Sequence, residues 1–292
     1  MYYPLIAEGF RKWLQTLGYA QSTVCLSVKF VSDFFFYLKY SEITTIEAVR
    51  PAIINNYYRH LQIRGNKRQS GGLSQNYITG NINAIKRFSR YLEQTGKLFF
   101  DVSIKTRPER ENPKIILTKQ EIRAFYKACD NSILGIRDRA ILSIFYGCGL
   151  RRSEGANLDV KDLLFKKKLL RVRAGKGYRE RYVPMAGAGR DDLENYICQA
   201  REKIQRFKST KNEALFLSMQ VKRMCGNALL NRIGRITIAA QIDKKIGLHS
   251  LRHSIATHLL QSGMTLEEVS RFLGHSSLES TQIYTHIAHV EL

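Results

Sequence analysis

Two polar clusters in the second half of the sequence combine residue types that could bind a phosphate group. GCGLRRSEGANL contains Arg151 and Arg152 followed by Glu154, and LHSLRHSIATHLL places His249 and Arg252 on one face of an expected helix. Arginine clamps phosphate oxygens with a planar fork that stays charged, and histidine can donate or accept a proton near neutral pH. Together these side chains could stabilise the charge that develops during phosphoryl transfer.

Three further residues could supply the moving proton and the nucleophile of such a reaction. Lys176 lies between two glycines in AGKG, and GHSSLESTQIYTH carries His275 and Tyr284 close to the end of the sequence. A tyrosine hydroxyl has a pKa near 10, so it must lose its proton when it attacks. Tyr284 is therefore either a nucleophile or an ordinary packing residue.

Each motif alone also has an ordinary structural explanation. An arginine pair after a helix usually neutralises the helix C-terminus, and a lysine in a glycine turn is usually just exposed. A histidine in an L-G-H turn most often caps or packs. His249 and His253 are spaced for metal binding, but no Glu follows His249 as in H-E-x-x-H and Arg252 would repel a cation.

Local signals predict a mainly helical second domain with one β-hairpin that carries Lys176. The alternation in KLLRVRAGKGYRERYVPM (168–185) predicts two strands around the glycine turn. Capping boxes predict helix starts at three places, each pairing a Ser or Thr with a Glu: Thr118 with Glu121, Thr265 with Glu268, and Ser276 with Glu279. Gly274 can end the second of these helices, so Tyr284 is expected on a short helix of its own. Leu251, Ile255 and Leu259 are expected to form the buried side of the helix that carries His249.

The first hundred residues are expected to be helical. SQNYITGNINAIKRFSRYLEQTGK can be capped by Ser74 and ended by Gly96. Its apolar positions recur at helical spacing and predict one buried face: Ile78, Ile82, Ile85, Phe88 and Leu92. Four polar residues lie largely off that face, where they either form a solvated surface or contact the DNA backbone: Asn83, Lys86, Arg87 and Arg90.

The polar, proline-containing segment 101–114 is the best candidate for a linker. We therefore expect a helical domain over 1–100 and a larger domain over 115–292. The net charge is +22, which predicts a polyanionic partner, nucleic acid first, with a basic protein that has no specific partner as the alternative. The five cysteines include no C-x-x-C pair, which indicates a reducing compartment. No signal peptide or membrane span is visible, so we expect a cytoplasmic protein.

In their order along the chain, GLRRSE, AGKGYRERYVP, HSLRHSIATHLL, LGHSS and STQIYTH resemble the motifs of the tyrosine recombinases, the phage-integrase-type family. The resemblance covers about residues 115 to 286. The first domain resembles, more loosely, the helical core-DNA-binding domain of Xer-type members. The family fold is mainly α with a small antiparallel β-sheet, and its two domains form a C-shaped clamp on DNA.

The resemblance implies an enzyme that cuts one DNA strand through a 3′-phosphotyrosine and rejoins strands through a Holliday junction. It implies catalytic roles for Arg151, Lys176, His249, Arg252, His275 and the nucleophile Tyr284. Lys176 is then the general acid, and His249 is a base or a phosphate ligand. Glu154 has a supporting role. The phosphate ester bond is conserved, so the family needs neither ATP nor a metal ion.

The resemblance also implies partners: a double-stranded core recombination site, a homotetramer on paired sites, and in some members an accessory or partner recombinase. Integration or inversion by a mobile element and Xer-like resolution of chromosome dimers both remain open. A DNA-binding protein that retains the fold without catalysis is the alternative function. Only THIAHVEL follows Tyr284 here, whereas many relatives have a longer final helix that regulates cleavage.

Overall fold

A computed structural model describes residues 3–66, 70–96, 100–106, 114–173, 180–209 and 211–275 of this chain. The chain divides into two compact units, Met1–Asn112 and Pro113–Leu292. The division lies within the segment 101–114 that composition marks as a linker. The described part contains no helix long and apolar enough to cross a membrane.

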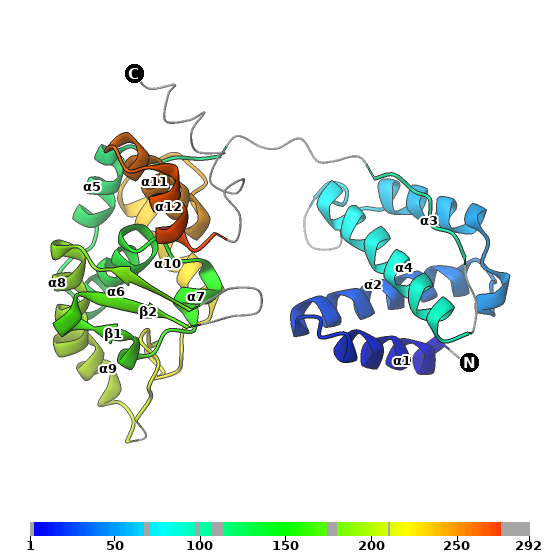
Figure 1. Cartoon of the computed structure of the whole chain (residues 1–292), viewed down its shortest axis with the longest axis horizontal. Helices are drawn as coiled ribbons and strands as arrows, with labels where there is room; N and C mark the ends of the chain where they lie inside the picture. Colours follow the sequence, from blue (N-terminus) through cyan, green and yellow to red (C-terminus); the bar gives the residue numbers. More distant parts are fainter. Residues whose placement is uncertain are drawn as a thin grey trace. The chain divides into compact units, whose positions relative to one another are not determined.

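The N-terminal unit is built from helices: α1 (Tyr3–Thr16), α2 (Gln21–Tyr40), the 3-10 helix η1 (Ile46–Ala48), α3 (Pro51–Ile63) and α4 (Gln75–Gln94) (Figure 1). The predicted face of α4 is confirmed, because all five of its apolar residues are buried in the core of this unit. Ser74 caps α4 by accepting a hydrogen bond from the backbone nitrogen of Tyr77 at 3.2 Å.

The C-terminal unit is also mainly helical and contains a small antiparallel sheet, as predicted (Figure 1). Its helices before the sheet are α5 (Lys119–Lys127), α6 (Ile133–Leu142), the π-helix η2 (Ser143–Gly147), α7 (Arg152–Ala156) and the 3-10 helix η3 (Val160–Asp162). Those that follow the sheet are α8 (Gly187–Asn195), the π-helix η5 (Tyr196–Arg201), α9 (Glu202–Gln205), α10 (Gly226–Ala239), α11 (Leu248–Gln261) and α12 (Leu266–Leu273).

The sheet has the order β1-β2-β3, with β1 (Leu163–Leu164), β2 (Leu169–Val172) and β3 (Arg181–Pro184). The two strands predicted on either side of AGKG are confirmed as the antiparallel pair β2 and β3, in which Val172 faces Arg181. The 3-10 helix η4 (Phe165–Lys167) joins β1 to β2. Lys176 lies between β2 and β3, in a segment outside the described residues.

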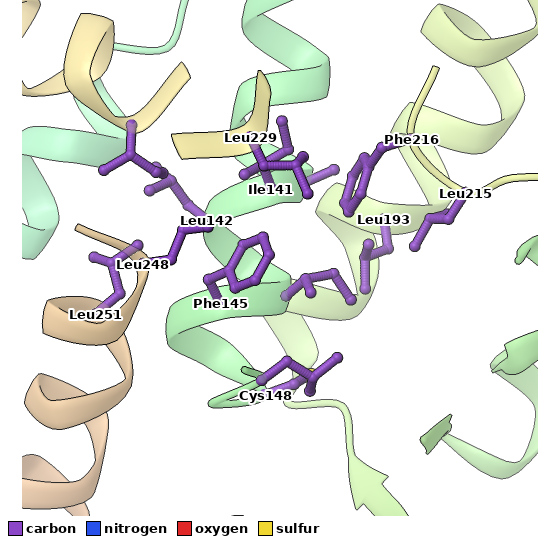
Figure 2. Close-up of a cluster of buried hydrophobic side chains, with 14 of the residues drawn as sticks. Ile141, Leu142, Phe145, Cys148, Leu193, Leu215, Phe216, Leu229, Leu248 and Leu251 are labelled. Carbon is purple, nitrogen blue, oxygen red and sulfur yellow. The ribbon is translucent and has the colours of Figure 1, made fainter. Parts of the chain in front are cut away.

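The core of the C-terminal unit surrounds α6 and η2. Figure 2 shows Ile141, Leu142 and Phe145 at its centre, with side chains from α10 and α11 packed around them. Burial of this apolar surface fixes the end of η2. The chain then leaves η2 through Gly149 and reaches Arg151, so the core determines where the first candidate arginine lies.

Two of the predicted capping boxes are confirmed. Thr118 and Glu121 start α5, and Thr265 and Glu268 start α12, each with both reciprocal hydrogen bonds. Gly274 ends α12 in the left-handed conformation, with φ of 65°. The expected box of Ser276 and Glu279 lies outside the residues that the structure describes.

The expected buried side of α11 was only partly right. Leu251 is fully buried, but Ile255 and Leu259 are only half-buried. The polar residues Arg252 and Ser254 occupy buried positions instead. The reason is tertiary: Ser254 Oγ accepts a hydrogen bond from the backbone nitrogen of Leu117 at 2.8 Å, so a hydroxyl packs at the core.

Candidate active site

Arg151 is positioned by the short helix that follows it. It stands at the N-cap of α7, where its backbone nitrogen donates to Glu154 Oε2 at 2.8 Å. Its side chain turns back to the same carboxylate, with Nη1 at 3.0 Å from Oε1. Glu154 therefore holds both the backbone and the guanidinium of Arg151.

The carboxylate of Glu154 forms ion pairs with three arginines, Arg151, Arg181 and Arg252. Arg181, the first residue of β3, binds it through a bidentate pair, Nη1 to Oε1 at 2.9 Å and Nη2 to Oε2 at 3.0 Å. Arg252 Nη1 lies 3.9 Å from Oε2. Burial alone would raise the pKa of Glu154, but hydrogen bonds and charges from Arg181 and Arg151 lower that pKa to about 2. Glu154 is thus ionised at all ordinary pH values and acts as a fixed counter-charge.

The buried guanidinium of Arg252 is held by backbone carbonyls. Nη1 donates to the carbonyl oxygen of Gly149 at 2.6 Å, and Nη2 donates to that of Leu273 at 2.7 Å. Gly149 has a φ of 61°, so it adopts a left-handed conformation that suits glycine. A Cβ on Gly149 would also lie within 2.9 Å of Leu273, so the glycine permits the close approach of α12.

The turn after α12 joins Arg151 to Arg252. Arg151 Nη1 and Nη2 donate to the carbonyl oxygens of Leu273 and Gly274, at 3.4 and 3.1 Å. Leu273 therefore accepts from both arginines. Three different elements, the start of α7, the middle of α11 and the end of α12, thereby meet within hydrogen-bond distance.

His275 is placed by the same turn. Its backbone nitrogen donates to the carbonyl of Ser270 at 3.1 Å while that of Gly274 donates to Arg271, which is a Schellman motif. Burial lowers the pKa of His275 to about 4, and the positive charges of Arg252, Arg151 and Arg181 add to this effect. At neutral pH the imidazole is therefore uncharged and can donate one N–H to a phosphate oxygen.

His249 lies in the first turn of α11. Desolvation lowers its pKa, and the charges of Arg252, Arg152 and Arg151 lower it further. An imidazole that is neutral at pH 7 can accept a proton, which a general base must do. The ring of His253 lies 6.5 Å from that of His249, and burial lowers the pKa of His253 to about 4.

Arg152 differs from its neighbour Arg151. Its side chain is exposed, and its Nη1 donates to Asn227 Oδ1 at 3.2 Å. Among the described residues, Arg151 and not Arg152 hydrogen-bonds to Glu154, Leu273 and Gly274, so the geometry favours Arg151 as the phosphate ligand. Lys176 and Tyr284 both lie outside the described residues.

Arg181 is a residue that the sequence analysis missed. The available signal was the alternation in RYVP, because Arg181 shares the inward face of β3 with the fully buried Val183. Arg173 was missed as well, and it stands at the other end of the segment that contains Lys176. Its Nη2 lies 2.7 Å from Asp162 Oδ2 and 2.9 Å from Asp159 Oδ2. Both strand ends next to that segment are therefore held by ion pairs.

The four candidate DNA contacts on α4 fall into two pairs. Asn83 and Arg90 are exposed. Lys86 and Arg87 have partners within the protein: Lys86 Nζ donates to the carbonyl of Ile104 at 3.1 Å, and Arg87 lies 5.7 Å from the ring centroid of Tyr19. Asn83 and Arg90 are thus the more accessible pair.

The C-terminal site can bind and neutralise a tetrahedral anion. Two arginine forks and a neutral histidine meet at one turn, and the single carboxylate among them orients the arginines. Over the described ranges, no group of three or more His, Cys, Asp or Glu residues is arranged to hold a metal ion.

Comparison with known proteins adds an independent finding. The profile of the phage integrase family matches residues 116–291. Tyrosine recombinase XerC of Oceanobacillus iheyensis is 32% identical over 238 residues, which cover 80% of this chain and 78% of that protein. Tyrosine recombinase XerD of Staphylococcus aureus is 30% identical over 287 residues, covering 97% and 94%. The fold is similar to the crystal structure of XerH bound to difH substrate in a pre-cleavage complex, with a TM-score of 0.68 and 23% identity over 90% of this chain and 75% of that one.

Proposed function

From the premise that this chain belongs to the phage integrase family and is a tyrosine site-specific recombinase, we propose the following mechanism. The Tyr284 oxygen attacks a phosphodiester of duplex DNA. A bond forms between this oxygen and phosphorus, and the bond from phosphorus to the 5′-oxygen breaks. His249 accepts the phenol proton, and Lys176 supplies the proton that leaves with the 5′-hydroxyl.

One observation supports this proposal most strongly: Arg151 and Arg252 share the carbonyl of Leu273 and lie beside the carboxylate of Glu154. Their spacing is therefore fixed before DNA binds. Fixed donors stabilise the extra negative charge of the transition state without reorganisation at the moment of reaction. His275, which follows the same turn, adds a third donor.

The covalent intermediate stores the energy of the broken ester. The 5′-hydroxyl of a partner strand can attack the phosphotyrosine, release Tyr284 and restore a phosphodiester, so neither ATP nor a metal ion is consumed. Two such exchanges pass through a Holliday junction. We propose that four copies on two paired core sites carry them out, with or without a partner recombinase.

The N-terminal unit is proposed to bind the DNA core site as well, as the clamp of the tyrosine recombinase family implies. Asn83 and Arg90 of α4 are exposed for backbone contacts, with Lys86 and Arg87 beside them. The net charge of the chain is +22, which favours binding of a polyanion such as DNA. We propose a cytoplasmic location, where chromosomal or mobile-element DNA would be the substrate.

Recombination of a plasmid tests the proposal. A binding site is first recovered from a random duplex library retained by the protein, and two copies are cloned into one plasmid. Deletion or inversion between the copies is expected in buffer with EDTA and without ATP. Specific binding without recombination, even with a cell extract that could supply a partner, would favour the non-catalytic DNA-binding alternative.

Salt dependence of binding tests the proposed role of α4. Arg90→Gln is expected to weaken DNA binding and to reduce the slope of log K against log salt concentration by about 1, because one phosphate contact is lost. Arg11→Gln, which removes an α1 cation paired with Glu8, is the control. The slopes are measured by fluorescence anisotropy. Equal slopes for Arg90→Gln and the native protein would remove Arg90 from the DNA interface.

A further inference from the structure

Arg181 is a nearly buried strand residue whose side chain binds Glu154 in the candidate site. Its side chain is only 11% exposed, and both terminal nitrogens are used on Glu154. Its Nε is buried with no hydrogen-bond partner among the residues that the structure describes. The hydrogen bonds that the structure shows for this guanidinium are therefore both with the carboxylate of Glu154.

Gly274 provides the space that Arg181 occupies. A Cβ built on Gly274 would lie 2.7 Å from Cδ and 2.9 Å from Cζ of Arg181. The turn that presents its carbonyl to Arg151 and precedes His275 is therefore packed directly against Arg181. Arg181 touches the turn on one side and the carboxylate on the other.

The burial of the Glu154 carboxylate explains why a third arginine, Arg181, lies beside it. Glu154 is nearly buried, with 9% of its side chain exposed, and burial of a lone carboxylate is costly. The bidentate pair with Arg181 keeps Glu154 ionised and fixes its plane. With its plane fixed, the carboxylate can hold the guanidinium of Arg151 in one orientation.

We propose that Arg181 is a positioning residue of the recombinase reaction: acting through Glu154 and the Gly274 turn, it orients Arg151 and His275 towards the scissile phosphate. This inference rests on the proposed function. It assigns Arg181 no contact with DNA or with the reacting atoms. Arg171, on the neighbouring strand β2, pairs with Glu180 at the surface and is the matched control.

The kinetic test separates cleavage from binding. Single-turnover cleavage of a nicked duplex that carries the selected site is measured at saturating protein. Arg181→Gln is expected to lower the cleavage rate about 10–100-fold, as loss of a residue that orients a site ligand commonly does, with the DNA Kd changed less than about threefold. Arg171→Gln should leave both unchanged. A loss confined to Kd, or a native cleavage rate, would overturn the proposal.

A double-mutant cycle tests whether Arg181 acts through Glu154. If it does, the variant with Arg181→Gln and Glu154→Gln should cleave within about threefold of Glu154→Gln alone. Losses that simply multiply would contradict this. Should either glutamine variant fail to fold, Arg181→Lys keeps the charge without the bidentate fork. It should still lose about tenfold in rate, and a native rate would overturn the proposal.

A titration without DNA keeps this inference distinct from the proposed function. The pKa of the His275 imidazole is followed by NMR in the full-length protein. Arg181→Gln removes one of the charges that lower this pKa and loosens the turn, so the pKa should rise, whereas Arg171→Gln should not change it. An unchanged pKa would overturn the positioning role. If no DNA is cleaved by the native protein, the proposed function fails while this titration still tests the contact.

Discussion

Arg252→Lys is expected to reduce the single-turnover rate of DNA cleavage about 1,000-fold while DNA affinity changes little. Arg252 uses its planar fork to bind the carbonyls of Gly149 and Leu273, at 2.6 and 2.7 Å. An ammonium group on a flexible stem cannot hold both carbonyls and also present a donor at a fixed position to phosphate. Removal of one preorganised donor from a transition state commonly costs a factor of about 100 to 1,000.

The control for this experiment is Arg152→Lys. Arg152 is an exposed arginine outside the Glu154 contacts, so its replacement should change the cleavage rate less than about fivefold. Melting curves establish that both variants are folded. Arg252→Lys with a rate within threefold of the native protein would show that the buried arginine does not clamp the phosphate.

Glu154→Gln is expected to cause a large loss of stability. The substitution leaves Arg151, Arg181 and Arg252 close together without their shared counter-charge. Removal of one partner from a buried ion pair typically costs about 3–5 kcal/mol. The free energy of unfolding at pH 7, measured by urea denaturation, should fall by that amount. Glu180→Gln, which breaks the exposed pair with Arg171, should lower the free energy of unfolding far less.

The same carboxylate predicts how stability depends on pH. The folded-state pKa of Glu154 is about 2, below its ordinary value of 4.5, so its contribution is present above pH 4.5 and is lost as the pH falls towards 2. This fall in pKa corresponds to about 3 kcal/mol. The stability difference between the native protein and Glu154→Gln should therefore shrink between pH 4.5 and pH 2. A difference that stays constant over this range would contradict the ion-pair account.

Local signals predicted much of the fold. Ser74, the Thr118 and Thr265 boxes, and the hairpin strands around AGKG all depend on contacts between residues close in sequence. The strand β1 could not be predicted, because its two residues are too short to show alternation. Ile255 and Leu259 are less buried than expected, because a helical stripe does not reveal which polar residue has a buried partner.

Resemblance to a family grouped residues that lie far apart in the sequence, which local patterns cannot do. The motif order indicated Arg151, Arg252 and His275, which meet at the turn that contains Gly274. It also indicated His249, whose pKa the charges of Arg252 and Arg151 help to lower. Arg181 remained hidden because its importance comes from Glu154, 27 residues away in sequence. Such a contact depends on how β3 packs against α7, and neither periodicity nor spacing encodes that packing.

Covalent trapping tests the central claim most directly. The full-length protein is incubated with a nicked duplex that carries the selected site, so that the short strand after cleavage diffuses away and cannot rejoin. We predict a protein–DNA adduct that survives denaturant, maps by mass spectrometry to the peptide containing Tyr284, and is absent with Tyr284→Phe. An adduct that persists in Tyr284→Phe, or none despite confirmed binding of native protein to the site, would contradict the account.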